Sequence, residues 1–213
     1  MTDLISPPAA VVGGSIVSFA SGLPASHRED VYMCTAFAQM ATRAAEADGL
    51  SGDWFAFYCN QLRFLGWDVP KPQTFNPAPS ASMGSKATER IRSALGEKFA
   101  LPISRALADL EHNASALSLF ESTSLSADVG YFQMIPCVMN GAHKVDMAIY
   151  NRKFSMLKKI SRFLFVKNAS LEEGGNEQLT MITFNTLYYA QFREKVKRSV
   201  LSQSVKYLSE LEI

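Results

Sequence analysis

The period of the hydrophobic pattern changes near residue 129, and this change limits the fold more than any other feature of the sequence. Before it, apolar residues recur three and four positions apart, as on one face of an α-helix. After it, apolar and other residues alternate, as in β-strands. A run of helices followed by a run of strands is typical of the α+β class.

The first half of the chain predicts several helices. Met33, Phe37, Met40 and Ala44 mark the apolar face of a helix over 28–47, which Asp48-Gly49 ends. Ser51 is the expected N-cap of the next helix, which carries an aromatic stripe. The other expected segments are an extended N-terminal stretch at 1–27, a helix over 52–65, a proline-rich loop at 68–84, a helix over 86–99, one with Pro102 at its first position and a short one over 114–120.

The second half predicts a mainly antiparallel sheet of about four or more strands, because short connections join successive strands. The N-terminal helices cover this sheet, together with a long C-terminal helix over 189–211. We expect a single domain over 1–213, since the chain shows one core. The strands are expected at 129–139, 143–150, 162–167 and 178–187.

Composition excludes several classes of function. The net charge of +1 gives no reason to expect a nucleic-acid partner. The three cysteines are an odd number without a Cys-x-x-Cys pair, which indicates reduced thiols rather than a disulfide framework. The three histidines are far apart, so we expect no metal site. The N-terminus has an acid where a secretory signal needs basic residues, and no run is apolar enough to span a membrane.

Asn140-Gly141 predicts a hairpin between the first two strands. Its register decides which side chains share a face with Cys137. A two-residue turn places Cys137 beside Lys144. A three-residue turn with a glycine bulge pairs Cys137 with Val145 and creates an almost wholly apolar face, composed of Ile135, Cys137, Met139, Val145, Met147 and Ile149.

A catalytic role needs groups that the sequence does not supply clearly. His143 is the histidine nearest to Cys137 in the sequence, and only the three-residue turn brings it within reach as a base. The chain has no Gly-x-Ser-x-Gly elbow, no Walker loop and no dinucleotide fingerprint. We therefore predict no catalytic residue, and keep a cysteine-dependent acyl-transfer enzyme and a lipid-free interaction module of a toxin system as alternatives.

Three segments resemble the Erwinia virulence factor (Evf) family, bacterial proteins linked to persistence in insect guts. They are Asp53-Trp54-Phe55-Ala56-Phe57-Tyr58 running to Leu65-Gly66-Trp67, the Tyr131–Cys137 strand, and the Thr183–Val200 strand and helix. The resemblance covers most of the chain from about residue 28 and is carried by aromatic residues and their spacing.

The resemblance implies an α/β fold with a fatty acyl chain, palmitate, held as a thioester on a cysteine in a central apolar tunnel. We assign this S-palmitoylation to Cys137, because a strand that faces the interior suits a tunnel wall; Cys59 and Cys34 are the alternatives. The residues expected to line the tunnel are Ile135, Met139, Val145, Met147, Ile149, Phe132 and Met134.

A hidden acyl chain does not anchor a protein, so the resemblance implies a virulence or toxin-associated lipid carrier with conditional membrane contact. We expect the basic segment 152–159 to be a solvated face, and assistance at an anionic surface is the alternative. The expected partner is the fatty acid, without metal or nucleic acid, and the protein partner is unknown. The expected location is the bacterial cytoplasm, with release or delivery to a host that uses no classical signal peptide.

Overall fold

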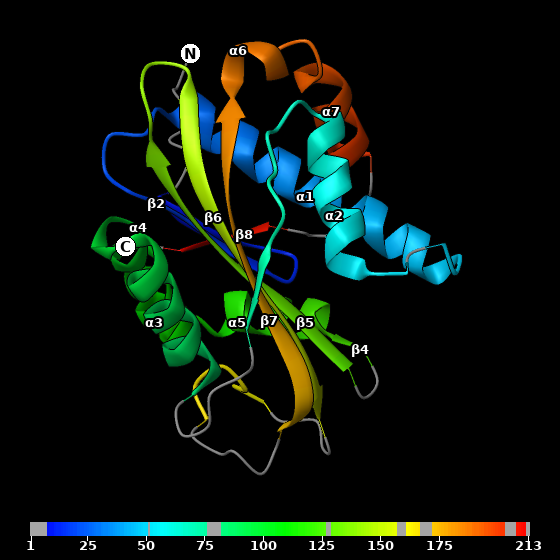
Figure 1. The fold of residues 1–213 in the computed structure, drawn as a ribbon, viewed down its shortest axis with the longest axis vertical. Coiled ribbons are helices and arrows are strands. Elements are labelled where there is room, and N and C mark those ends of the chain that lie inside the picture. The colour runs from blue at the N-terminus through cyan, green and yellow to red at the C-terminus, as the bar shows by residue number, and fades with distance from the viewer. Residues whose placement is uncertain are drawn as a thin grey trace.

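An eight-stranded sheet runs through the middle of the molecule, with helices on both of its faces (Figure 1). The computed structural model describes residues 8–50, 52–75, 82–126, 129–156, 161–166, 172–202 and 208–211. The strand order is β3-β7-β6-β5-β2-β1-β8, and β4 pairs with β5 outside this path. All strand pairs are antiparallel except β2–β5. This arrangement confirms the predicted α+β class with a mainly antiparallel sheet.

The strands differ greatly in length, and the three longest are neighbours in the sheet. The long strands β5, β6 and β7 have 11, 13 and 14 residues. The bounds are β1 Ala9–Val12, β2 Ser15–Phe19, β3 Gln73–Phe75, β4 Leu125–Ser126, β5 Val129–Met139, β6 Lys144–Met156, β7 Glu172–Asn185 and β8 Leu208–Leu211.

The helices begin and end close to the predicted positions in the first half of the chain. The helix over 28–47 is confirmed as α1, and the N-cap of α2 is Asp53, whose side chain accepts from Phe55 N and Ala56 N. The bounds are α1 Ala25–Ala47, α2 Trp54–Phe64, α3 Met83–Leu95, α4 Glu97–His112, α5 Ala114–Ser124, α6 Thr186–Tyr189 and α7 Arg193–Leu201. The predicted cap Ser51 lies outside the described residues.

Helix α4 begins five residues before Pro102, which the sequence had placed at the first helical position. Gly96 has a φ of 87°, and this left-handed conformation lets the chain turn directly from α3 into α4. Pro102 is therefore buried inside α4, where its ring packs in the core.

The described part of the N-terminal segment, which the sequence predicts as an extended stretch, forms a hairpin inside the sheet. Strands β1 and β2 pair across Gly13-Gly14, and β2 lies parallel to β5. A buried network of side chains joins this hairpin to α1 and β5, since Ser15 Oγ donates to Gln133 Oε1 at 2.8 Å and Gln39 Nε2 donates to Ser15 Oγ. The uncharged residues 8–19 thus contain two strands of the sheet, each with a neighbouring strand on both sides.

Two predictions for the second half were wrong. The long helix expected over 189–211 ends at Leu201, and Leu208–Leu211 form the edge strand β8 against β1. Leu208 and Leu211 are three positions apart, which suits one face of a helix. In β8 they point to opposite faces of the sheet instead, Leu208 toward one apolar layer and Leu211 toward the other, and pairing with β1 stabilises this strand. Residues 162–166 form a turn rather than a strand, and residue 167 lies outside the described residues.

The sheet separates two apolar layers, because its side chains alternate between the two faces. The cysteine layer lies between the sheet and α1, α2 and α7, and its sheet residues are Val17, Phe19, Ile135, Cys137, Val145, Met147, Ile149, Ile182 and Phe184. The opposite layer lies between the sheet and α3, α4 and α5, and its sheet residues are Ile16, Phe132, Met134, Ala148, Tyr150, Phe154 and Leu179.

Candidate functional site

The β5–β6 hairpin pairs Cys137 with Met147 and Met139 with Val145. Neither predicted register is correct, because the connection is longer: Asn140 N donates to Lys144 O at 2.9 Å, and the Asn140 side chain binds Asp146. The observed register differs from the three-residue turn by two positions, which keeps every side chain on its face. The predicted apolar face containing Cys137 is therefore confirmed by a different turn.

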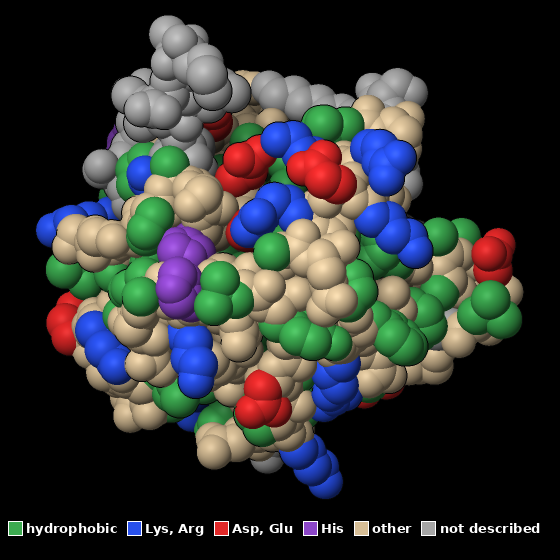
Figure 2. Space-filling model, turned by 90° about the horizontal axis from the view of Figure 1, so that it is seen from above, with side chains coloured by type: hydrophobic (Ala, Val, Ile, Leu, Met, Phe, Trp, Pro, Cys, Tyr) green, Lys and Arg blue, Asp and Glu red, His purple; other side chains and the backbone are tan. Residues whose placement is uncertain are grey.

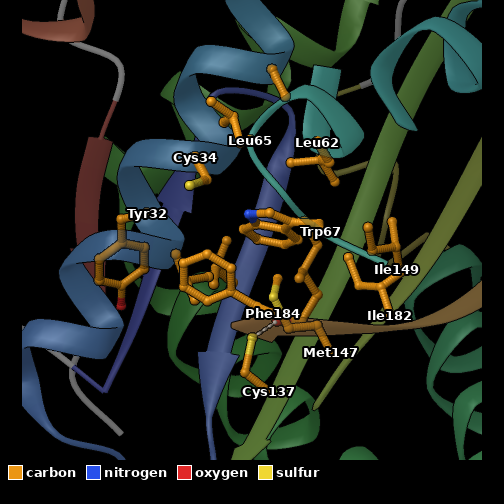
Figure 3. Close-up of a cluster of buried hydrophobic side chains, with 14 of the residues drawn as sticks. Tyr32, Cys34, Leu62, Leu65, Trp67, Cys137, Met147, Ile149, Ile182 and Phe184 are labelled. Carbon is orange, nitrogen blue, oxygen red and sulfur yellow. Dashed lines mark hydrogen bonds between the residues drawn. The ribbon is translucent and has the colours of Figure 1, made fainter. Parts of the chain in front are cut away.

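Cys137 lies in the cysteine layer, completely removed from water (Figure 3). Its sulfur donates a weak hydrogen bond to Ile135 O, with 3.5 Å between the two atoms. Phe19 is its partner on the parallel strand β2, and Met147 is its partner on β6. The sulfur thus has strand neighbours that are all apolar.

The other two cysteines belong to the same layer. Cys34 on α1 and Cys59 on α2 are both buried and packed in the cluster that contains Cys137. Figure 3 shows Cys34 above Trp67 and Phe184, on the helix side of the layer. All three candidate attachment residues are therefore buried in the same apolar layer.

Burial makes all three thiols poor acids. It raises the pKa of the Cys137 thiol well above its usual range, and nothing charged opposes this effect. It likewise raises the pKa of Cys34, although the polar groups of Tyr189 and Trp67 nearby lower it in part. The pKa of Cys59 is raised to about 12, mainly by burial. Because the thiolate is the nucleophile, burial makes each of these thiols a poor nucleophile.

His143 does not serve Cys137 as a base. It is exposed in the β5–β6 connection, and its carbonyl oxygen accepts from Thr186 N at 3.0 Å. The His27 ring bonds the same threonine, with 2.9 Å between His27 Nε2 and Thr186 Oγ1. Figure 2 looks onto this end of the molecule and shows histidine side chains at the surface. The Cys-His arrangement of a cysteine hydrolase is therefore not formed by these two residues.

The structure brings together five of the seven residues predicted to line a tunnel. Ile135, Val145, Met147 and Ile149 are buried in the cysteine layer, and Met139 packs against it. Phe132 and Met134 lie in the opposite layer, on the other face of β5. Their even positions in the strand explain this, because neighbouring residues of a strand point to opposite faces.

The basic segment 152–159 is not a solvated basic surface at its start. Arg152 is completely buried and donates through Nη1 to Glu177, its cross-strand partner. Lys158 and Lys159 lie outside the described residues. The sequence analysis missed this buried ion pair, although Arg152 alternates with Tyr150 and Phe154 on a strand whose apolar positions face the interior.

The described surface includes the following three hollows. They have volumes of 690, 680 and 310 Å³, and Cys137 lines none of them. Among the described residues, no three histidine, cysteine or acidic side chains are grouped so that they could hold a metal ion. No helix in the described ranges is both long and apolar enough to cross a membrane.

No protein-family model and no curated protein matches the chain. Solved structures that match part of the chain include a delta-endotoxin, with a TM-score of 0.44 and 11% identity over 81% of this chain and 80% of the other. Activated Cyt2Ba from Bacillus thuringiensis subsp. israelensis has a TM-score of 0.35 and 12% identity over 59% and 77%. The Evf virulence factor has a TM-score of 0.37 and 12% identity over 93% and 84%. Similarity at this level shows neither family membership nor activity.

Proposed function

We propose that this protein carries a fatty acyl chain as a thioester on Cys137, within the cysteine layer, and that it acts in virulence. One observation carries the lipid part of the proposal. The sulfur of Cys137 is fully buried in a wall of apolar side chains, among them Ile135 and Met147, on the sheet face covered by α1 and α2. The virulence part rests on the resemblance of the sequence to the Evf family.

The thioester would form by acyl transfer from an activated donor. The Cys137 sulfur attacks the acyl carbon, a new carbon–sulfur bond forms, and the donor thiol leaves with the Cys137 proton. Burial holds the pKa of this thiol high, so the reaction needs the cysteine layer to be open. Once the layer closes, the same burial keeps water from the ester. We therefore place acylation before or during the closing of α1 and α2 over the sheet.

The acyl chain would become part of the hydrophobic core. Each buried methylene contributes about 0.8 kcal/mol, so a chain of about 16 carbons contributes on the order of 10 kcal/mol. The hollows described above are lined by other residues, so the chain takes its space by widening the cysteine layer. Met147, with its flexible thioether beside Cys137, is a side chain that can adapt to such a change.

Intact mass spectrometry of protein purified from its native bacterium tests the attachment. We expect the mass to exceed that of the sequence by one acyl group, and hydroxylamine to remove this increment. Cys137→Ala should abolish the increment, while Cys34→Ala and Cys59→Ala should retain it. An unmodified native protein, or an increment that persists in Cys137→Ala, contradicts the proposal.

The virulence role has a separate test. Bacteria that carry the wild-type gene should persist longer in the insect gut than bacteria that carry Cys137→Ala, provided both proteins accumulate equally. Equal persistence of these strains and of a deletion strain would remove the proposed role, whatever the mass measurement shows.

A further inference from the structure

A cleft of 690 Å³ lies between α3 and α4, on the sheet face opposite Cys137. Its volume falls within the range of about 300–1,000 Å³ that is usual for small-molecule sites. One wall is apolar and includes Leu107, Ala108 and Phe165. The other wall is the face of α3 that carries Ser85, Lys86 and Arg90, and Glu177 of β7 reaches the cleft from the sheet.

Two guanidinium groups share the carboxylate of Glu177. Arg152 binds one oxygen from within the sheet, and Arg90 Nε lies 3.4 Å from the other. The side chains of Arg152 and Glu177 are 0% and 2% exposed, so this charge cluster is poorly screened by water. The single negative charge of Glu177 is therefore matched by two positive charges, those of Arg152 and Arg90.

Arg90 is held in place by Phe75. Its guanidinium carbon lies 4.3 Å from the centre of the Phe75 ring, which fixes the plane of the group. Only Nε donates to Glu177, and neither Nη group donates to another residue in the described part of the chain. Arg90 is half-buried in the cleft wall and has donors left for an anion.

Lys86 lies four residues before Arg90, one helical turn away on the same side of α3, and Ser85 lines the cleft beside them. The pKa of Lys86 is lowered, first by burial and next by the positive charge of Arg152. Ser82 Oγ donates to Ser85 Oγ at 2.9 Å, which leaves the Ser85 hydroxyl hydrogen to donate elsewhere. The acidic side chains at the rim, Glu89 and Glu111, are bound by other arginines.

We propose that this cleft binds the phosphate group of a small phosphate monoester. A guanidinium fork, an ammonium group and a hydroxyl suit the tetrahedral oxygens of an anion with a charge of about −1.5 to −2. The first turn of α3 adds the partial positive charge of a helix N-terminus. The apolar wall then holds the organic part of the ligand. The site shares no residue with the cysteine layer, so it is independent of the proposed acylation.

Calorimetry of the full chain with glycerol 3-phosphate tests the proposal, in a phosphate-free buffer with sodium chloride at matched ionic strength as the blank. Arg90→Gln and Lys86→Gln should each weaken binding by about tenfold or more, because each removes a charged hydrogen-bond donor. Arg105→Gln is the matched control, since Arg105 is exposed on α4 and does not line the cleft.

Vesicle binding distinguishes a lipid headgroup from a soluble phosphate monoester as the source of the phosphate. Binding to phosphatidylcholine vesicles that contain phosphatidic acid, lost in Lys86→Gln and absent with phosphatidylcholine alone, supports a lipid headgroup. Binding of glycerol 3-phosphate without vesicle binding supports a soluble phosphate monoester. No heat with glycerol 3-phosphate together with no Lys86-dependent vesicle binding overturns the proposal. Equal weakening in Arg105→Gln also overturns it. If Arg90→Gln lowers the melting temperature, the affinity measured for Lys86→Gln decides the test.

Discussion

The Arg193 guanidinium binds the Asp30 carboxylate through two parallel hydrogen bonds, Nε to Oδ1 and Nη2 to Oδ2, each 2.7 Å long. These bonds join α7 to α1 on the outside of the cysteine layer. The Asp30 side chain is 4% exposed, so little water competes for it. A bidentate bond of this kind fixes orientation as well as distance.

Asp30→Asn should therefore lower the free energy of unfolding by about 1.5–3 kcal/mol, the usual range for hydrogen bonds to a charged group. Glu29→Gln is the matched control, because Glu29 binds Lys197 on the same pair of helices but is 49% exposed. Exposed ion pairs contribute about 0–1 kcal/mol. Urea unfolding measures both variants, and equal losses would contradict the assigned role of Asp30.

The free energy of unfolding should depend strongly on both partners of the buried Arg152–Glu177 ion pair. Arg152→Met leaves Glu177 buried with less compensation and should cost about 3–5 kcal/mol. Adding Glu177→Leu should recover part of this loss, because two apolar side chains replace a pair of charges. Unfolding in urea checks both chains. A double variant that is less stable than Arg152→Met would show that the charges themselves, rather than their pairing, are required.

Gly66 has a φ of 85°, and a Cβ at this position would lie 2.0 Å from Cδ1 of Tyr188. Gly66→Ala should therefore cost more than the roughly 1–2 kcal/mol of left-handed strain alone. Gly22→Ala measures the strain alone, since its φ is 92° and a Cβ there meets no atom within 4 Å. Combining Gly66→Ala with Tyr188→Ala should remove the clash. Measured by thermal unfolding against Tyr188→Ala, the stability lost on adding Gly66→Ala should then be close to that lost in Gly22→Ala against wild type.

The raised pKa of the Cys59 thiol predicts that the folded protein becomes less stable at alkaline pH. Its pKa rises from 9.0 to about 12 in the folded chain, so above pH 9 the unfolded chain loses a proton that the folded chain keeps. The contribution of Cys59 to the free energy of unfolding is fully present below pH 9. It is lost as pH rises toward 12, by up to about 1.4 kcal/mol per pH unit. The stability difference between wild type and Cys59→Ala should shrink accordingly in urea unfolding at pH 8, 9 and 10. A constant difference would contradict the raised pKa.

Local pattern was enough to predict most of the helices and the strand β5. The apolar stripe of α1 and the alternation of β5 are each complete within one segment, so no distant partner is needed to recognise them. The apolar face that carries Cys137 was predicted for the same reason. The turn predicted between β5 and β6 was wrong. Asn140 binds Asp146 through its side chain, and this contact lengthens the connection.

The remaining errors involve contacts between distant parts of the sequence. Residues 8–19 carry no charge and fit several structures, and only the pairing of β2 with β5 places them within the sheet. Likewise, Leu208–Leu211 become a strand because β1 offers them an edge. The burial of Arg152 depends on Glu177, which lies 25 positions later. A single sequence contains no signal for such pairings, because each depends on the assembled sheet.

The position of β8 sets the order in which the fold can be completed during synthesis. Strand β1 lies between β2 and β8, so one of its edges stays unpaired until the ribosome has released residues 208–211. An N-terminal hairpin with an open edge invites pairing with other nascent chains. Pairing of β8 with β1 therefore covers the edge at which newly made copies could otherwise associate.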